Sequence, residues 1–144
     1  MIPKKIILAE DNIADAELTK IAFKDLGLPL EVVHVMDGQQ LVDYVKRGPL
    51  SDIVLILLDL NMPRMGGLEV LRYFYNDPVF KKLPVVVLSS SNHQSDVWAC
   101  YDHGANAYVC KPIDMEKFNA TIKSIADFWC DINVLPTFEY ETAP

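Results

Sequence analysis

Near its middle the chain reads Ile53-Val54-Leu55-Ile56-Leu57-Leu58-Asp59, a run of six apolar residues that ends on an acid. Three more short apolar runs also stop on polar residues. They cover residues 6–9, 85–88 and 107–110, and they are followed by Glu10-Asp11, Ser89 and Lys111. Short, unbroken apolar runs of this kind are typical of strands that are buried on both faces of a parallel sheet. The sequence therefore predicts four buried strands whose carboxyl ends carry polar side chains.

Segments with the apolar spacing of amphipathic helices separate these runs. Leu18, Ile21, Ala22 and Leu26 recur at i, i+3, i+4 and i+8, and Gly27 stops the helix that they predict. Residues 30–35 are predicted to form a further strand, and residues 38–47, 68–75 and 96–103 to form helices. A last helix is predicted after its capping residue Asp114, with an apolar stripe of Phe118, Ile122, Ile125, Ala126 and Trp129. Strand and helix thus alternate five times.

A repeated strand and helix unit with short loops predicts an α/β fold, in which helices cover both faces of one parallel sheet. The common solution for five units is the flavodoxin-like, doubly wound (βα)5 sheet with strand order 2-1-3-4-5. In that order the switch point lies between strands 1 and 3, where Glu10-Asp11 and Asp59 fall. We predict one domain over residues 1–130. Residues 131–144 are predicted to form a C-terminal tail, because they lack helical periodicity.

The composition limits the classes of function. A chain of 144 residues, 51% of them hydrophobic, has the length and apolar mass for one domain. Its net charge of -7 and its lack of a long Lys/Arg cluster argue against a nucleic-acid binder. No apolar stretch approaches the roughly 20 residues of a membrane-spanning helix. Three cysteines without C-x-x-C spacing fit a reducing compartment. We therefore expect a cytoplasmic protein without a nucleic-acid or membrane partner.

Three acids are predicted to converge at the carboxyl edge of the sheet. Asp59 ends the central strand, where an aspartate can act as a nucleophile toward phosphorus and form an aspartyl phosphate. Taken alone, an acid at this position also suits a helix cap or a loop, and so do the adjacent acids Glu10 and Asp11. Three converging carboxylates repel one another unless a cation lies among them, and Mg²⁺ prefers such oxygen ligands. The group therefore predicts a Mg²⁺ site beside a phosphoacceptor.

Two further polar side chains are predicted at the same edge. Lys111 follows the fifth strand and offers positive charge to a phosphoryl oxygen or to the Asp59 carboxylate. Pro112 comes next, and an X–Pro bond adopts the cis form more readily than other peptide bonds, which is one way to aim the lysine inward. Ser89 ends the fourth strand with a hydroxyl that can bond a phosphoryl oxygen. The serine run at residues 89–91 equally suits plain loop polarity.

Four motifs stand at these strand ends. They are Glu10-Asp11-Asn12 after the first strand, Leu-Leu-Asp-Leu-Asn-Met-Pro-Arg-Met-Gly-Gly at residues 57–67, Ser89 after the fourth strand, and Ala-x-x-Tyr-Val-x-Lys-Pro at residues 105–112. Jointly they resemble the receiver domains of two-component response regulators, and the resemblance covers residues 4–130. Glu10 stands where the family more often has Asp, and Ser89 where it more often has Thr. Neither change removes a required chemical group.

The resemblance implies how the acids act. Asp59 would accept a phosphoryl group from the phosphohistidine of a sensor histidine kinase. Asp11 and the backbone carbonyl of Asn61 would bind Mg²⁺ together with Asp59. Glu10 would act on the ion largely through water.

The resemblance also implies a conformational switch. Ser89 and Lys111 would contact the phosphoryl group on Asp59. Ser89 would move toward that group, and Tyr108 would follow it as the coupled aromatic residue of the switch. With no room for an output domain, the signal is expected to leave by contact with other proteins.

Within the family, the chain is most similar to stand-alone regulators that work with bacterial phytochrome-type histidine kinases. The similarity rests on the Glu-Asp-Asn motif, on a long loop at residues 76–83 and on the short chain. It implies a homodimer built on helix 4, strand 5 and helix 5, with the apolar tail at residues 134–138 contributing. Trp98 and Tyr101 on the fourth predicted helix suit such a surface, although aromatic residues at this spacing also pack inward.

Two other classes of protein share parts of this pattern. A Mg²⁺-dependent phosphatase or phosphotransferase with an aspartyl nucleophile would need a general acid or base two residues after Asp59, where the chain has Asn61, which does not titrate. A flavodoxin-like FMN carrier would need a phosphate loop rich in hydroxyls and glycine, but Glu10-Asp11 would repel phosphate. The sequence therefore favours a signalling module that catalyses only its own phosphorylation and dephosphorylation, rather than an enzyme.

Overall fold

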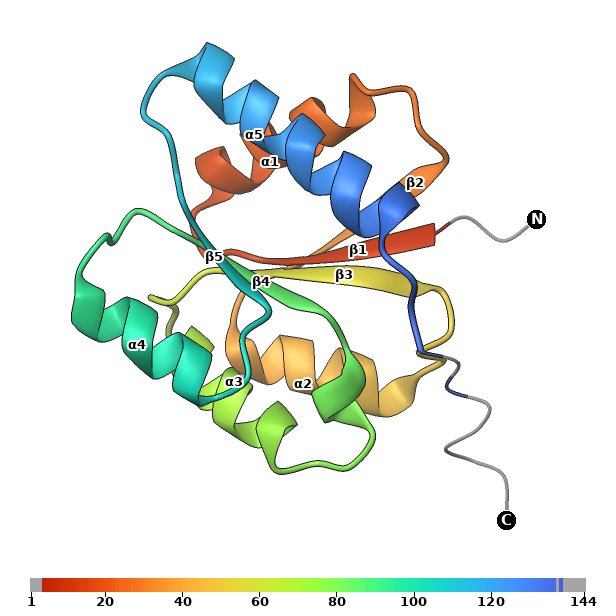
Figure 1. Cartoon of the computed structure of the whole chain (residues 1–144), viewed down its shortest axis with the longest axis vertical. Helices are drawn as coiled ribbons and strands as arrows, with labels where there is room; N and C mark the ends of the chain where they lie inside the picture. The colour runs from red at the N-terminus through yellow and green to blue at the C-terminus, as the bar shows by residue number, and fades with distance from the viewer. Residues whose placement is uncertain (1–3, 137, 139–144) are drawn as a thin grey trace.

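Five parallel strands form one sheet in the order β2-β1-β3-β4-β5, in a computed structural model that describes residues 4–136 and 138. The strands are β1 (Lys4–Ala9), β2 (Leu30–Val35), β3 (Ile53–Leu58), β4 (Val85–Ser89) and β5 (Ala107–Cys110). The helices are α1 (Ile13–Lys24), α2 (Gly38–Arg47), α3 (Gly67–Tyr75), α4 (Gln94–Asp102) and α5 (Met115–Asp127). Helices α1 and α5 cover one face, and α2, α3 and α4 cover the other (Figure 1). The predicted fold and strand order are confirmed.

The sheet divides the apolar side chains into two cores. All six residues of β3 are buried, which explains why this strand is an unbroken apolar run. Ile56 and Leu58 join the core under α2 and α3, whereas Leu55 and Leu57 join the core under α1 and α5. Alternation along the strand therefore serves both faces of the sheet, as expected for a central parallel strand.

Short polar side chains cap the helices that follow the loops at the carboxyl edge of the sheet. The Asn12 side chain accepts a hydrogen bond of 3.0 Å from the Asp15 amide at the start of α1. Asp37 and Asp114 cap α2 and α5 in the same way, with the amides of Gln40 and Glu116 as donors, each at 2.8 Å. Each cap satisfies an amide that the helix leaves unpaired. The caps thereby fix where each strand-to-helix loop ends.

The predicted apolar stripe of α1 is wrong at Leu18 and Ile21, whereas Ala22 is buried and Leu26 packs on the core under α1 and α5. The buried face consists of Ala16, Thr19, Ala22 and Phe23. Ile21 is 52% exposed and Leu18 is 38% exposed. Two overlapping stripes satisfy the helical period here, and the side with the small residues Ala16 and Ala22 lets α1 approach the sheet closely. Helix α1 therefore presents apolar side chains to solvent.

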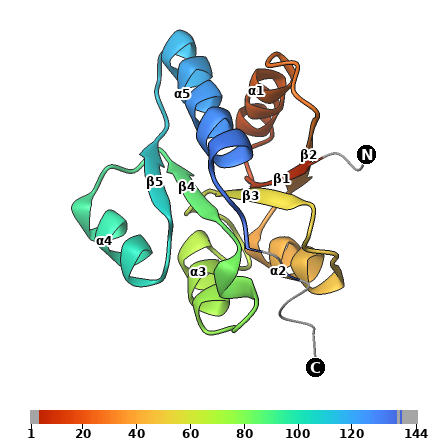
Figure 2. The ribbon, with the colours of Figure 1, turned by 45° about the vertical axis from the view of Figure 1, so that its right-hand side comes forward.

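The segment after α5 turns back across the amino-terminal edge of the sheet (Figures 1 and 2). A π-helical turn over Phe128–Ile132 continues α5, and the Lys4 ammonium donates to the Cys130 carbonyl at 3.1 Å. Leu135 packs on the core under α5, and Phe138 packs on the core under α2. These two tail residues thus contact their own chain. Residues 137 and 139–144 of the predicted tail lie outside the described residues.

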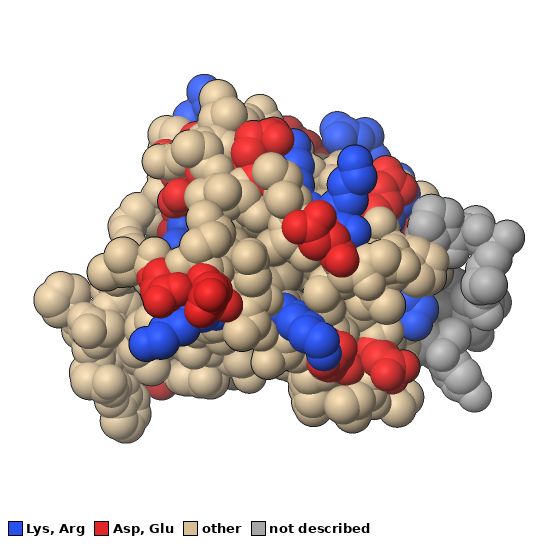
Figure 3. All heavy atoms as spheres, turned by 90° about the horizontal axis from the view of Figure 1, so that it is seen from above, with Lys and Arg blue, Asp and Glu red and all other residues tan. Residues whose placement is uncertain are grey.

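The surface agrees with the acidic composition. On the face that Figure 3 shows, the described acidic and basic side chains are interspersed, and no continuous basic patch covers it. In the described part of the chain, no helix has both the length and the apolar composition to cross a membrane.

The cysteines are free, and burial raises the pKa of both Cys100 and Cys130 to about 11, so these two thiols stay protonated.

Candidate metal and phosphoacceptor site

The pairing of β1 with β3 brings three carboxylates together. Ala9 pairs with Leu58, and the Asp59 amide donates to the Ala9 carbonyl at 3.0 Å. One carboxylate oxygen from each of Glu10, Asp11 and Asp59 lies within 4.8 Å of the others. Glu10 is buried, Asp59 is half-buried and Asp11 is exposed. The group therefore opens to solvent on one side only.

Backbone contacts fix Glu10 at the base of this group. Its amide donates to the Val35 carbonyl at 3.1 Å, and its carbonyl oxygen lies 2.7 Å from Nε2 of His34. Because a carbonyl only accepts, this nitrogen of His34 carries a hydrogen. The Asn12 amide donates to the Glu10 carboxylate at 3.3 Å. Three separate hydrogen bonds thus hold Glu10 in place, and His34 is one of the partners.

Lys111 places its ammonium among the acids. Its Nζ forms an ion pair with the Glu10 carboxylate and lies 3.5 Å from Oδ2 of Asp15. Burial alone lowers the pKa of Lys111, but the hydrogen bond with Glu10 and the charge of Asp59 outweigh burial, so that its pKa is raised. The Lys111–Pro112 bond is trans, since the cis X–Pro bond of the described chain is Gly48–Pro49. Lys111 reaches the acids without the cis geometry.

Burial, together with the neighbouring Glu10, raises the pKa of Asp59 to about 7. Burial is the largest cause, followed by the hydrogen bond and the charge of Glu10, while the charge of Lys111 acts in the opposite direction. A cation among these oxygens would relieve the repulsion. Carboxylate oxygens are the ligands that Mg²⁺ and Mn²⁺ prefer. The residues present therefore fit a divalent metal ion.

The raised pKa of Asp59 predicts that metal-free Asp59→Asn is more stable than wild type at about pH 8, by about 1–2 kcal/mol. Between the ordinary pKa of 3.8 and about 7, the folded state binds more protons than the unfolded state, so stability falls as the pH rises. A full shift would be worth about 4 kcal/mol, which we discount because Asp59 is half-exposed. Urea unfolding in EDTA measures the difference, and it should vanish near about pH 4. A destabilised Asp59→Asn at about pH 8 would contradict this account.

Ser89 and Tyr108 meet at a residue that the sequence did not single out. Ser89 is fully buried, and its Oγ accepts from the Ser91 amide at 3.1 Å. The Tyr108 hydroxyl donates to the Ser91 carbonyl at 2.8 Å, and the Ser91 hydroxyl donates to Asp96 at 2.5 Å. Ser91 therefore joins the predicted switch residues to the first turn of α4. The one available signal was the acid five residues after Ser91, which alone is too common to interpret.

Asn61 lies two residues beyond Asp59, in a loop that closes on itself. The Gly67 amide donates to the Leu60 carbonyl at 2.9 Å, so the two ends of the loop meet beside Asp59. A Cβ atom on Gly67 would lie 2.4 Å from the Asp59 carbonyl oxygen, and only glycine fits there. The structure thus brings together Glu10, Asp11, Asp59 and Lys111 directly. Asn61 lies near them because it follows Asp59 by two residues in the chain.

The comparison with known families agrees with this geometry. The family model of the response regulator receiver domain matches residues 6–123. The chain belongs to this family. As a receiver domain it is a phosphorylation-dependent signalling module, and the acidic group at the carboxyl edge of its sheet fits the divalent metal ion that receiver domains bind.

The relatives of this receiver domain include stand-alone regulators of similar length. It is 35% identical over 141 residues to the response regulator Rcp1 of Synechocystis sp. strain PCC 6803, covering 93% of this chain and 94% of Rcp1. The structure of the phosphorylated cyanobacterial phytochrome response regulator RcpA is 39% identical, with a TM-score of 0.86, and the match covers 94% of this chain and 99% of RcpA. The structure of the Mn²⁺-bound form of Rcp1 is 32% identical, with a TM-score of 0.84, and the match covers 94% of this chain and 100% of the Rcp1 chain.

Proposed function

We propose that this protein is a single-domain response regulator of the cytoplasm, which accepts a phosphoryl group on Asp59 from the phosphohistidine of a sensor histidine kinase. The convergence of Glu10, Asp11 and Asp59 with Lys111 carries the proposal. Nothing in the site favours the alternative of a Mg²⁺-dependent phosphatase, because Asn61 occupies the place of its general acid or base.

The transfer needs an anionic nucleophile to approach an anionic phosphoryl group. An oxygen of the Asp59 carboxylate forms the new bond to phosphorus while the bond from phosphorus to the histidine nitrogen breaks and the imidazole leaves. Asp11, Asp59 and the Asn61 carbonyl would hold Mg²⁺, which would supply positive charge to the phosphoryl oxygens. Lys111 adds a second positive charge, which exchanges its Glu10 partner for a phosphoryl oxygen. Charge positioning is the main contribution of the protein.

Phosphorylation is proposed to change the hydrogen bonds around Ser91. A phosphoryl group on Asp59 offers an acceptor to the Ser89 hydroxyl, which in this structure accepts from the Ser91 amide. Moving Ser89 disturbs the loop that the Tyr108 hydroxyl holds through the Ser91 carbonyl. The phosphoryl group thereby favours one of two arrangements of the loop before α4 and of β5. The phosphorylation signal would be transmitted to other proteins through the face formed by α4, β5 and α5.

An apolar rim beside the acids suits docking of the kinase. On α1, Ile13 is 64% exposed and Ile21 is 52% exposed. After β5, Ile113 is fully exposed and Met115 is half-exposed. Both line a hollow of about 280 Å³ beside Lys111, to which α1 contributes Leu18 and Thr19. Exposed apolar side chains that lie close together often mark sites of contact with another protein. Similarity to the cyanobacterial phytochrome response regulator RcpA supports a phytochrome-type histidine kinase as the donor.

Charge placed on this rim should slow transfer from the kinase without changing the chemistry at Asp59. Ile21→Asp and Ile113→Asp are each expected to lower the rate of transfer from a phosphorylated phytochrome-type kinase by about tenfold or more. Their labelling by acetyl phosphate should equal that of wild type. Val134→Asp is the matched control, since Val134 is 90% exposed and follows α5 at the other edge of the sheet. Equal kinase rates in all four proteins would remove this docking site.

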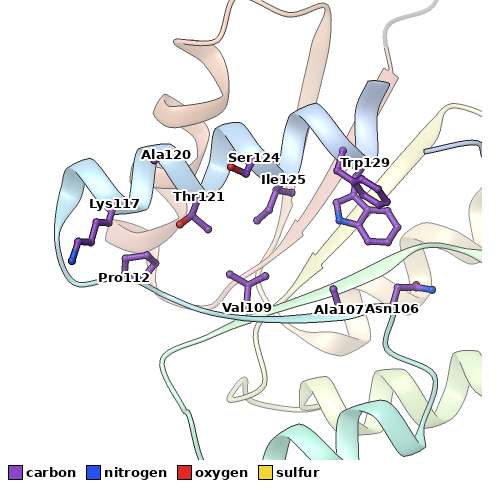
Figure 4. A pocket seen from close by; sticks show the side chains of 11 residues that line it. Asn106, Ala107, Val109, Pro112, Lys117, Ala120, Thr121, Ser124, Ile125 and Trp129 are labelled. Carbon is purple, nitrogen blue, oxygen red and sulfur yellow. The ribbon is translucent and has the colours of Figure 1, made fainter. Parts of the chain in front are cut away.

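A second proposed contact is a homodimer through α4, β5 and α5. On α4, Trp98 is 68% exposed and Tyr101 is 51% exposed. A groove of about 860 Å³ runs between the open edge of β5 and α5, where Val109 faces Ile125 and Trp129 lies at one end (Figure 4). An isologous pair would cover these apolar groups in both copies. Leu135 and Phe138 of the predicted tail pack on their own chain.

Light scattering at micromolar concentrations tests the homodimer. Wild type is expected to show a concentration-dependent approach to the dimer mass, because association removes Trp98 from water. Trp98→Glu should stay monomeric, whereas Tyr75→Glu, on the exposed side of α3, should dimerise like wild type. A monomer mass for wild type throughout would end the dimer proposal.

A further inference from the structure

The far side of the loop that carries Asn61 holds a strained residue. Arg64 has a φ of 62°, the one positive φ of a non-glycine residue in the described chain. An arginine in this left-handed region costs about 1 kcal/mol or more, because its Cβ approaches the backbone. Such a conformation persists only where other contacts enforce it. The contacts of Arg64 therefore need an explanation.

A buried carboxylate holds the Arg64 side chain. Asp37, which follows β2, is fully buried, and its Oδ2 accepts from Nε of Arg64 at 2.8 Å and from a terminal guanidinium nitrogen as well. Its other oxygen accepts from the Gln40 amide at 2.8 Å and caps α2. Two donors of one guanidinium on one carboxylate make a strong, directional ion pair. Asp37 thus has one oxygen for its helix and one for the loop after β3.

A second contact fastens the same part of the loop. The Gly38 amide donates to the Met65 carbonyl at 2.9 Å. A Cβ atom on Gly38 would lie 2.2 Å from that carbonyl oxygen, so the two backbones meet only because residue 38 is glycine. The loop over residues 60–67 is therefore closed at its base by Gly67 and Leu60, and tied at its tip to the start of α2.

Asn61 depends on this frame for its position. Asp59 is held by β1, but within residues 4–136 no hydrogen bond holds Asn61 itself. We propose that the Asp37–Arg64 ion pair is a positioning clamp, which keeps the loop over residues 60–67 in the shape that presents the Asn61 carbonyl to the divalent ion. The proposal rests on the function proposed above, and it adds two residues, neither of which touches the ion.

The variant Arg64→Gly separates the clamp from other effects. Glycine adopts a φ of 62° without strain, and the Asp37 side chain is still present to cap α2, so the ion pair is lost without any new backbone strain. Isothermal titration with Mg²⁺ is expected to show affinity weaker by about tenfold, the lower end of what supporting residues of metal sites contribute. Arg64→Lys, which keeps one charged donor, should fall between Arg64→Gly and wild type.

Hydrogen exchange of the metal-free protein gives an independent readout. The amides of Gly38 and Gly67 should lose protection in Arg64→Gly, while those of β3 keep it. The control is Asp52→Asn, which removes an ion pair of 3.2 Å with Lys5 at the opposite edge of the sheet. It should lower stability and leave both Mg²⁺ affinity and loop protection unchanged.

The outcomes separate the clamp from the metal site itself. Wild-type Mg²⁺ affinity in Arg64→Gly, within about twofold, together with unchanged protection of Gly38 and Gly67, would overturn the clamp. Should wild type bind no Mg²⁺, the metal assignment of the proposed function fails. The exchange of the Gly67 amide in metal-free protein would then still decide whether the ion pair holds the loop.

Discussion

Replacing Asp59 with Asn is expected to abolish phosphorylation by acetyl phosphate in the presence of Mg²⁺. The amide of asparagine has no anionic oxygen to attack phosphorus. Among the described residues, Asp59 is the carboxylate that lies at the end of β3, near the ion pair of Lys111 and Glu10. Intact-mass analysis should show one added phosphoryl group in wild type. It should show none in the variant, and none in wild type after treatment with EDTA.

The two other acids of the cluster make a control for the loss of negative charge necessary. Asp11 and Glu10 lie beside Asp59, so a general loss of charge at the site could also slow labelling. Asp15→Asn is therefore the appropriate control, because Asp15 contacts Lys111 at 3.5 Å without belonging to the cluster. It should label like wild type. Full labelling of Asp59→Asn would refute Asp59 as the acceptor.

The second large effect is expected on metal affinity. Asp11→Asn should weaken Mg²⁺ binding by roughly 30- to 150-fold, or about 2–3 kcal/mol. Full Coulomb attraction at about 4 Å reaches about 4 kcal/mol for unit charges near a protein surface, and the exposure of Asp11 reduces it. The variant should remain folded, since Asp11 is exposed and precedes α1.

Titration calorimetry at fixed ionic strength measures this affinity. Asp15→Asn again matches the change in charge, and its Mg²⁺ affinity should stay within about twofold of wild type. If both variants weakened binding equally, the ion would respond to the general negative field and not to direct ligation. Affinity in Asp11→Asn equal to that of wild type would remove Asp11 from the ligands.

The strands were predictable because burial on both faces leaves a plain sequence signal. The bounds of β3 match the apolar run at residues 53–58, and those of α2 match the segment between Asp37 and Gly48. Both ends of α2 carry residues with a local structural reason, an aspartate cap and a glycine of positive φ. Where a local rule sets the boundary, sequence is sufficient.

Helix α1 shows where periodicity alone is insufficient. The stripe through Leu18 and Ile21 and the stripe through Ala16 and Phe23 both satisfy the helical period, and the more apolar stripe was expected inside. The sheet accepts the side with alanines, because they allow closer packing. The exposed stripe is then free for a partner, a choice that hydrophobicity does not reveal.

The placement of the acids followed from the parallel sheet, but the residues that support them did not. Strand ends predicted that Glu10 and Asp59 would lie close together, and the roles assigned to them stay predictions. Asp37 and Arg64 are separated by 27 residues and belong to different loops. Their pairing depends on the relative position of α2 and the loop after β3. No local pattern encodes such a contact.

Reductive trapping of the phosphorylated protein tests the central claim most directly. Borohydride converts an aspartyl phosphate into homoserine, and tandem mass spectrometry of the digested chain then locates the changed residue. After transfer from a phosphorylated histidine kinase, we predict homoserine at position 59 and unchanged Glu10 and Asp11. Homoserine at another position, or a phosphorylated chain without any reduced residue, would contradict the assignment of Asp59 as the phosphoacceptor.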